Sequence, residues 1–347
     1  MIRVIIRVDA SLQIGIGHVM RCLTLAQGLQ EKGIKVKFIC RKHKGNLIDK
    51  IRSKGFHTYE LESSDEKNID SKLAHASWLG VTQQKDVEDC INILKIKKTD
   101  WLIVDHYGLD EQWQKSLKPY YKKLMVIDDL ADRQFDCDVL LNQNFGSHKD
   151  HYINKLPKSC KLLIGCEYAL LRPEFLKLRS QALEKRRNTK KIKNILISMG
   201  GSDIKNITYD ILRDIDNNYN VVVALGKDSP HNIIIKDHSK NKNIKIIIDA
   251  DNMAELMFNA DLAIGAAGST SWERCCSGLP TLVYITADNQ NEIAENLQEV
   301  GAVKIVKNLK KDLLAIVSDF SLWKSMSKIS NKVCNGHGVN KVIKYLQ

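Results

Sequence analysis

A glycine-rich segment with a single histidine contains the residues best suited to chemistry. Residues 9–21 read DASLQIGIGHVMR and lie between an apolar run at 2–8 and a stretch whose apolar residues recur at helical spacing. A strand, a glycine loop and a helix in this order let backbone N–H groups approach a ligand and direct the helix's positive end toward it. His18 stands where this helix is predicted to begin, and the positive end disfavours a protonated imidazole. We therefore expect a neutral His18 that removes a proton from water or from an acceptor hydroxyl group.

Two other interpretations of this loop are open from its sequence. Gly15 and Gly17 form an incomplete dinucleotide-binding fingerprint, because Arg21 and Cys22 stand where its last glycine would fall. The second predicted strand also ends without an acidic residue for a ribose, which disfavours a nicotinamide cofactor. Alternatively, the glycines form only a tight turn and His18 caps the helix.

Composition and charge are those of a globular protein with room for two domains. The chain has 347 residues, 44% hydrophobic and 27% charged. Its net charge is +12, but the lysine clusters fall at predicted loops and helix ends without interleaved aromatic residues. We therefore expect solvated surfaces and no nucleic-acid partner.

The cysteine pattern and the lengths of the apolar runs indicate the cellular compartment of the protein. Nine cysteines form neither a Cys-x-x-Cys pair nor a zinc-binding spacing, which predicts reduced thiols, no metal site and a cytoplasmic protein. No apolar run reaches the ~18 residues of a membrane span. The oligomeric state is left open.

Strands that alternate with helices predict an α/β fold with two doubly wound, Rossmann-like parallel sheets. We expect one domain at 1–170, a helical and basic linker at 171–193 and a second domain at 194–347, with the active site in a cleft between them. Ligands of such sheets bind at the carboxyl ends of strands. Asp128 and Asp129 follow one strand and could form a metal or acid pair, but adjacent residues normally diverge, so we expect a structural or orienting role.

Three turns of the second domain, each after a predicted strand, could together hold a nucleotide. The sequence GGSD at 200–203 offers backbone and hydroxyl donors for phosphate oxygens. The sequence GAAGSTSWE at 265–273 could hold a pyrophosphate, with Glu273 accepting hydrogen bonds from a ribose diol. The sequence ADNQ at 287–290 could contact a sugar through its amides. Each could be only a capped turn, but three in one domain favour a nucleotide.

These motifs resemble those of the GT-B nucleotide-sugar glycosyltransferases. The peptidoglycan lipid-intermediate N-acetylglucosaminyltransferase has the nearest architecture, but the motifs are more similar to the UDP-2,4-diacetamido-2,4,6-trideoxy-β-L-altropyranose hydrolases of pseudaminic acid biosynthesis. The resemblance covers nearly the whole chain and rests on 9–21, VDHYG at 104–108, YALLR at 168–172, MGGSD at 199–203 and NQ at 289–290. The turn at 268–273 is richer in small residues than in some of these hydrolases and is closer to the transferases, which leaves substrate identity more open than the uridine contacts.

The resemblance implies a UDP-linked diacetamido sugar and water as substrates, cleavage between C1 and the glycosidic oxygen with inversion, and no metal or other cofactor. It implies that His18 is the base and that Tyr107 and Asn289 act near the sugar; Tyr107 could also be only a half-buried aromatic residue. A glycosyltransferase and a non-catalytic nucleotide-sugar sensor are the alternatives. The residues expected to contact the sugar or UDP are Gly15, Gly17, Arg21, Gly200, Gly201, Ser202, Asp203, Gly268, Ser269, Thr270, Glu273 and Gln290.

Overall fold

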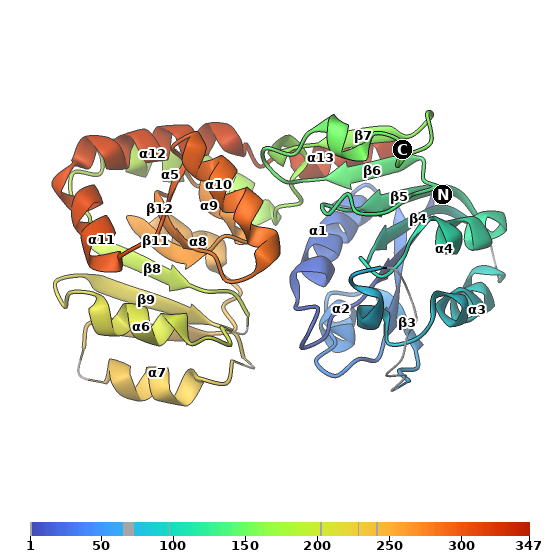
Figure 1. Ribbon diagram of the computed structural model, residues 1–347, viewed down its shortest axis with the longest axis horizontal. Coiled ribbons are helices and arrows are strands. Elements are labelled where there is room, and N and C mark those ends of the chain that lie inside the picture. The colour runs from blue at the N-terminus through green and yellow to red at the C-terminus, as the bar shows by residue number, and fades with distance from the viewer. Residues whose placement is uncertain (1, 65–72, 97, 202, 228, 241) are drawn as a thin grey trace. The chain divides into compact units, whose positions relative to one another are not determined.

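The computed structural model describes residues 2–64, 73–96, 98–201, 203–227, 229–240 and 242–347, and it divides into two compact units. Unit 1 comprises Met1–Leu170 and Gly338–Gln347, and unit 2 comprises Leu171–His337. Each unit contains one parallel sheet with helices packed against it (Figure 1). The predicted fold of two parallel-sheet α/β domains is therefore confirmed.

Unit 1 has a seven-stranded sheet in the order β3-β2-β1-β4-β5-β6-β7. Strands β2 and β3 lie on one side of β1 and strands β4 to β7 on the other, so the strand order reverses between β1 and β4. The elements are β1 (Arg3–Val8), α1 (Gly17–Glu31), β2 (Lys35–Arg41), α2 (Ile48–Ser53), β3 (His57–Leu61), η1 (Ala76–Leu79), α3 (Gln83–Leu94), β4 (Thr99–Asp105), α4 (Glu111–Leu117), η2 (Lys118–Tyr120), β5 (Tyr121–Ile127), β6 (Val139–Asn142), η3 (Lys149–Tyr152), β7 (Lys161–Ile164), η4 (Cys166–Tyr168) and α13 (Gly338–Leu346).

Both faces of the unit 1 sheet are buried, which explains the continuous apolar runs in its central strands, such as residues 4–6 of β1 and 101–104 of β4. Val4 and Ile6 of β1 join a core with α1, α2 and α13, whereas Ile5 joins the opposite core with α3 and α4. Buried carboxylates lie where three of these strands end, at Asp9, Asp105 and Asp128.

Unit 2 has a six-stranded sheet in the order β10-β9-β8-β11-β12-β13, with the same reversal between its first and fourth strands, β8 and β11. The elements are α5 (Pro173–Asn188), β8 (Asn194–Ser198), α6 (Ile207–Asp214), β9 (Asn220–Leu225), α7 (Asn232–Ser239), β10 (Ile244–Ile248), α8 (Met253–Asn259), β11 (Leu262–Ala266), α9 (Thr270–Cys276), β12 (Thr281–Tyr284), η5 (Asp288–Gln290), α10 (Asn291–Glu299), β13 (Val303–Ile305), α11 (Leu309–Ser318) and α12 (Phe320–Val333).

Two of the predicted domain limits are wrong. The expected linker at 171–193 is mostly α5, which packs within unit 2 because the buried Arg186 donates to the carbonyl oxygens of Met257 and Ala260. The expected second domain ends too late, since α13 buries Val342 and Ile343 in the unit 1 core. Both errors arise from contacts between residues far apart in the chain, which local composition does not reveal.

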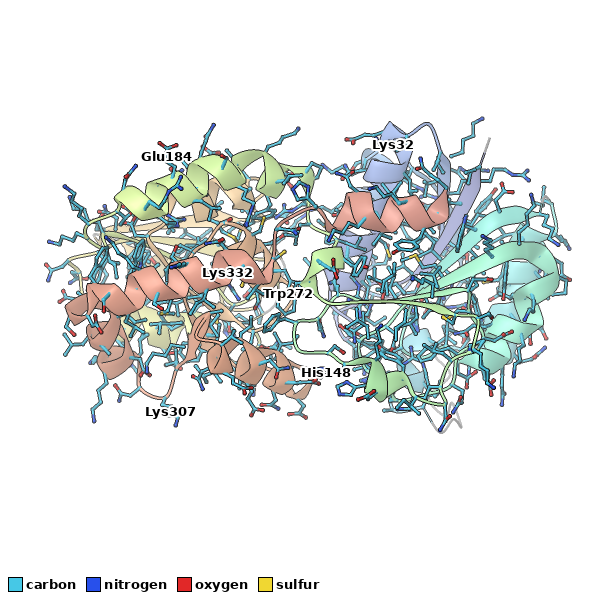
Figure 2. The ribbon with its side chains drawn as sticks, turned by 90° about the horizontal axis from the view of Figure 1, so that it is seen from above. Lys32, His148, Glu184, Trp272, Lys307 and Lys332 are labelled. Atoms are coloured by element: carbon cyan, nitrogen blue, oxygen red, sulfur yellow. The ribbon has the colours of Figure 1, made fainter. Side chains whose placement is uncertain are left out.

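The labelled side chains of Figure 2 include four exposed charged residues and one buried tryptophan. Lys32, Glu184, Lys307 and Lys332 extend from the ribbon, whereas Trp272 of α9 is only 1% exposed (Figure 2). The burial of Trp272 agrees with the expected role of this residue in helix packing. The nine cysteines all lie within the described ranges and form no disulfide. In the described part of the chain, we find no helix with the length and apolar character needed to cross a bilayer.

Candidate active site

The reversal of strand order in unit 1 brings two predicted motifs together. Strands β1 and β4 are parallel neighbours, with Val8 aligned to Asp105. The glycine loop that follows β1 and the segment 106–108 that follows β4 therefore leave the same edge of the sheet side by side. In open parallel sheets, this point is where ligands bind.

The glycine loop is a compact turn that presents His18 on the first turn of α1. The Ser11 carbonyl accepts from the Gly15 N–H, and Gly15 has φ +77°, a conformation that L side chains rarely adopt. Helix α1 begins at Gly17, after Ile16, which makes no side-chain cap. His18 is therefore not a helix cap, contrary to the second interpretation of the loop.

The nearest charged neighbour of His18 is the carboxylate of Asp105, a partner that the sequence analysis did not assign. Nδ1 of His18 lies 2.5 Å from Oδ1 of Asp105, whose side chain is fully buried. Burial alone would raise the pKa of this carboxyl group, but Arg21 and His18 outweigh burial and hold the pKa well below its usual range. An ionised carboxylate accepts the Nδ1 proton and leaves Nε2 as the ring nitrogen able to take up another.

Arg21 is predicted to contact the substrate, and in the structure its guanidinium group binds the carboxylate of Asp105 within unit 1. Nε and Nη2 donate to the two oxygens of Asp105 at 2.6 and 2.7 Å. A bidentate pair of this kind fixes the plane of the carboxylate. Arg21 is therefore placed to hold Asp105 against His18.

Tyr107 and the aspartates after β5 extend this array. The Tyr107 hydroxyl donates to Oδ1 of Asp129, and Oδ2 of Asp129 lies 3.6 Å from Nη1 of Arg21. Burial and Asp129 raise the pKa of Tyr107 well above its usual value, so the phenol keeps its proton and can only accept from a further group. Asp128 diverges from its neighbour, as expected, and pairs instead with Arg133 at 2.8 Å.

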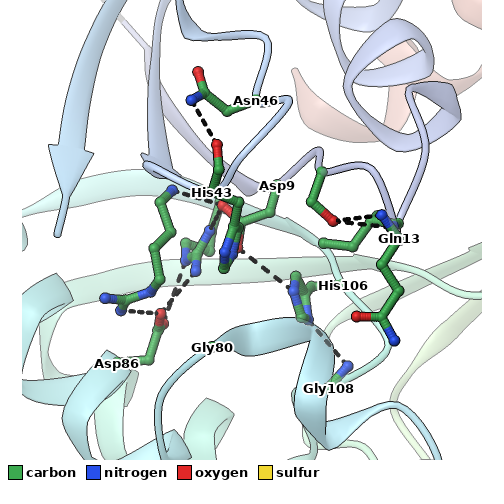
Figure 3. A network of polar contacts seen from close by, with 12 residues as sticks. Asp9, Gln13, His43, Asn46, Gly80, Asp86, His106 and Gly108 are labelled. Atoms are coloured by element: carbon green, nitrogen blue, oxygen red, sulfur yellow. Dashed lines mark hydrogen bonds and ion pairs between the residues drawn. The ribbon is translucent and has the colours of Figure 1, made fainter. Parts of the chain in front are cut away.

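A second buried network anchors the start of the glycine loop (Figure 3). Asp9 accepts from Nη1 of Arg7 at 2.6 Å and from the backbone N–H of Arg41 at 2.7 Å. Nε2 of His106 faces Asp9 at 3.5 Å, while its Nδ1 accepts from the Gly108 N–H. Burial lowers the pKa of His106 to about 3, so its ring is neutral and carries its proton on Nε2. These contacts fix the start of the loop that leads to His18 and the backbone on both sides of Tyr107.

Asp86 completes this network, and we expect it to make unit 1 sensitive to acid. Its carboxylate accepts from Arg7 and Arg41, both at 2.7 Å. Burial opposes ionisation, but the two guanidinium groups hold the pKa of Asp86 at about 2. Since this pKa is depressed, the stabilisation is complete above the unfolded value near 4 and is lost as pH falls toward 2. Asp86→Asn should lower the free energy of unfolding at pH 7 by about 3–5 kcal/mol.

Urea unfolding followed by circular dichroism between pH 7 and pH 2 measures this effect. The Asp86→Asn variant should also show a flatter pH dependence of stability below pH 5. Asp89→Asn is the matched control, because its side chain is 18% exposed and contacts Arg41 alone among the buried arginines. Wild-type stability of Asp86→Asn at pH 7 would contradict the prediction.

In unit 2, the glycine turn after β8 lies at the corresponding reversal point. Gly200 and Gly201 are exposed, and a β-carbon at Gly226 would overlap the Gly201 carbonyl oxygen, so the loops after β8 and β9 touch. Ser202 lies outside the described residues. Asp203 was expected to contact the ligand, but its carboxylate accepts from the N–H groups of Ile207 and Thr208 and caps α6.

The turn after β11 and the segment after β12 meet in unit 2. A β-carbon at Gly268 would lie 3.9 Å from Nε2 of Gln290, whose Oε1 is held by the N–H and hydroxyl of Thr286. Ser269 is exposed and Thr270 half-buried beside them. The side chain of Asn289 lies outside what the structure describes.

Glu273 follows the same turn and forms an ion pair that the sequence did not predict. Its Oε1 lies 3.2 Å from Nη2 of Arg172, so Oε2 is available to another donor. Burial raises the pKa of Glu273, and Arg172 opposes that shift. Arg172 belongs to the YALLR segment at 168–172. The sequence could not predict the role of Arg172 because Glu273 lies 101 residues away in the chain.

Comparisons with known proteins bear on the family and the fold of this chain. Residues 174–319 match the glycosyltransferase family 28 C-terminal domain. The UDP-2,4-diacetamido-2,4,6-trideoxy-β-L-altropyranose hydrolase of Campylobacter jejuni is 30% identical over 269 residues, which cover 77% of this chain and 85% of that protein. The spore coat polysaccharide biosynthesis protein SpsG of Bacillus subtilis is 26% identical and covers 98% of this chain and 96% of that protein. The crystal structure of Acinetobacter baumannii MurG covers 100% of this chain and 99% of that chain, at TM-score 0.67 and 16% identity.

The two parallel sheets with matching strand orders, together with the structural likeness to MurG, place this chain in the GT-B fold class. The sequence comparison narrows that class to one family. The chain belongs to the family of the UDP-2,4-diacetamido-2,4,6-trideoxy-β-L-altropyranose hydrolases.

Proposed function

We propose that this chain is a cytoplasmic enzyme that hydrolyses a UDP-linked 2,4-diacetamido-2,4,6-trideoxy sugar, with the β-L-altropyranose as the substrate, in pseudaminic acid biosynthesis. The contact that carries the proposal is the one between Nδ1 of His18 and the buried, ionised Asp105, at 2.5 Å. It leaves Nε2 as a proton acceptor at the strand edge where ligands bind in this class of sheet. The family relationship supports the choice of substrate, since the Campylobacter jejuni relative is named for that sugar nucleotide.

The proposed reaction is a single displacement at the anomeric carbon. The water oxygen bonds to C1 while the bond from C1 to the phosphate-bearing oxygen breaks, and UDP leaves with that electron pair. His18 takes one proton from the attacking water. Because water attacks the face opposite the leaving group, the anomeric configuration inverts. UDP is a good leaving group, so it needs less acid assistance than the alcohol released by an ordinary glycosidase.

Unit 2 is proposed to bind the UDP portion. Gly200, Gly201 and Ser269 are exposed, and backbone N–H groups of such turns suit phosphate oxygens, which gain negative charge as the bond breaks. The free Oε2 of Glu273 suits a ribose hydroxyl group. The contacts of Gln290 and Gly268 support a shared role for these two segments.

Incubation of the protein with the UDP-sugar alone, in water enriched in ¹⁸O, tests the proposal. We expect UDP and free sugar, with the label in the sugar. Label in the phosphate would mean attack at phosphorus and would overturn the proposed step. Release that requires an added acceptor would indicate a glycosyltransferase, an alternative favoured by the match to a glycosyltransferase domain. Saturable binding without release would indicate a sensor.

Glu273→Gln should weaken nucleotide binding without impairing the chemical step. A carboxylate accepts a ribose hydroxyl more strongly than an amide does, so we expect the Kd for UDP to rise about tenfold while kcat at saturation changes little. Isothermal titration with UDP measures the first quantity. Glu255→Gln on α8 is the control, because Glu255 is exposed and accepts a hydrogen bond from Asn252 at the start of the same helix. An unchanged Kd for Glu273→Gln would remove the ribose assignment.

A further inference from the structure

One tryptophan differs from the rest in its exposure. Four of the five tryptophans are nearly inaccessible, since Trp101 is 5% exposed, Trp113 and Trp272 1% and Trp323 0%. Trp78, in the short helix η1, is only half-buried. Folding normally buries so large an apolar ring, so a partly open indole calls for a reason in its surroundings.

Those surroundings include the proposed catalytic base. The ring centroid of Trp78 lies 6.3 Å from that of His18 and 5.6 Å from that of Tyr107. His75 lies against the same indole at 4.3 Å and is also half-buried. His18 and Tyr107 themselves meet edge to face at 4.7 Å. An aromatic wall formed by His75 and Trp78 thus stands beside the group that would activate water.

Both ends of η1 pack closely against other segments of unit 1. A β-carbon at Gly108 would lie 2.9 Å from the His75 carbonyl oxygen, so the segment after β4 admits η1 only because residue 108 is glycine. At the other end of η1, a β-carbon at Gly80 would lie 2.7 Å from Cε1 of His43, which belongs to the network around Asp9. The two ends of η1 therefore pack closely against the segment that carries Tyr107 and against the network around Asp9.

Burial keeps the wall uncharged on its histidine side. Desolvation lowers the pKa of His75, with Arg133 and His18 acting in the same direction and Asp132 opposing them. A neutral imidazole beside an indole offers an apolar, polarisable surface. Aromatic surfaces of this kind bind apolar groups of a ligand and leave hydrogen bonding to a few polar neighbours.

We propose that Trp78, backed by His75, is a specificity-determining residue that receives the methyl-bearing face of the sugar. This inference rests on the proposed function. A 2,4-diacetamido-2,4,6-trideoxy hexose keeps one free ring hydroxyl and carries a C6 methyl and two acetamido methyl groups, so its surface is far more apolar than that of a common hexose. An aromatic wall beside the base favours such a sugar over one that carries hydroxyl groups at C4 and C6.

Intrinsic fluorescence reports on this contact before any turnover. With the other four indoles buried, we expect the UDP-diacetamido-trideoxy sugar to change tryptophan emission more than UDP alone does, and Trp78→Phe to abolish the difference. The measurement uses His18→Asn protein so that the sugar nucleotide stays intact. Equal responses to UDP and to the sugar nucleotide in the Trp78-containing protein would overturn the inference.

Steady-state kinetics then measure selectivity. Trp78→Leu keeps apolar volume but removes the ring, and it should raise KM for the diacetamido-trideoxy substrate roughly tenfold. The preference for this substrate over UDP-N-acetylglucosamine, in kcat/KM, should fall by a similar factor. Gly108→Ala should act in the same direction by displacing His75, although it leaves Trp78 itself unchanged.

Controls separate this inference from the proposed function. Tyr59→Ala removes another half-buried aromatic ring of unit 1, one that lies against His57 and Lys37, and should leave both kinetic constants unchanged. Titration with UDP and thermal melting show whether each variant is folded. A folded Trp78→Leu protein with wild-type KM and selectivity would refute the role of Trp78 while the hydrolase assignment stands. Failure of the wild type to release UDP from the sugar nucleotide would refute the hydrolase assignment instead.

Discussion

His18→Asn is expected to lower kcat for UDP release about 10²–10⁴-fold, the usual contribution of a positioned general base. Asparagine can still donate to Asp105, but it has no nitrogen that takes a proton from water near neutral pH. The Kd for UDP should stay within about twofold of wild type, because the residues proposed to bind UDP belong to unit 2. Single-turnover measurements at saturating sugar nucleotide, combined with titration of UDP, give the two values separately.

His148→Asn is the matched control for this substitution. His148 is an exposed histidine that precedes η3, and its ring neighbour is His151 at 6.0 Å. We expect its kcat to equal that of wild type. A folded His18→Asn enzyme with near-normal kcat would mean that another group activates the water, and the mechanism proposed for this site would be wrong.

Much of the fold could be predicted from local patterns because both sheets are buried on both faces. The apolar run at 2–8 became β1, Arg3–Val8, and the run at 101–105 became the end of β4, Thr99–Asp105. Residues 171–193 were interpreted as a linker because they are hydrophilic, although they contain α5, in which Arg186 is buried. A charged residue whose partners are backbone carbonyls of another helix leaves no signal in composition.

The candidate site was less predictable because it depends on strand order. Strand ends could be recognised as ligand-binding positions, but nothing local indicates that β1 lies beside β4. The sequence analysis therefore gave Asp105 no role in the site. Its position as the last residue of a buried strand could have indicated one. From the sequence, we expected the positive end of the helix to set the protonation of His18. In the structure, Oδ1 of Asp105 lies 2.5 Å from Nδ1 of His18. Asp203 remains a predicted ligand contact, but its carboxylate also accepts from the N–H groups of Ile207 and Thr208 at the start of α6, a structural role that the sequence did not reveal.

Asp105→Asn tests the residue that this strand order adds to the site. The amide has nearly the shape of the carboxylate, but it no longer favours a proton on Nδ1 of His18, and it cannot accept both hydrogen bonds from Arg21. Loss of the correct tautomer in such a pair costs about 10³–10⁴-fold in kcat. KM should change much less, because the side chain of Asp105 is fully buried and is proposed to act through His18 rather than on the ligand. The unfolding free energy should also fall by roughly 3–5 kcal/mol, since Arg21 is left without its carboxylate.

A lower kcat alone does not distinguish an orienting role from general disruption, so the combination of two substitutions decides the matter. If Asp105 acts only by orienting His18, it contributes nothing once that ring is gone. The double variant His18→Asn with Asp105→Asn should then have the kcat of His18→Asn alone, within about threefold, at a temperature where thermal melting shows both to be folded. Multiplied losses would instead mean that Asp105 supports activity independently of His18, for example by holding Arg21, Asp129 and Tyr107 in place. The base would then act without the carboxylate that we infer directs it.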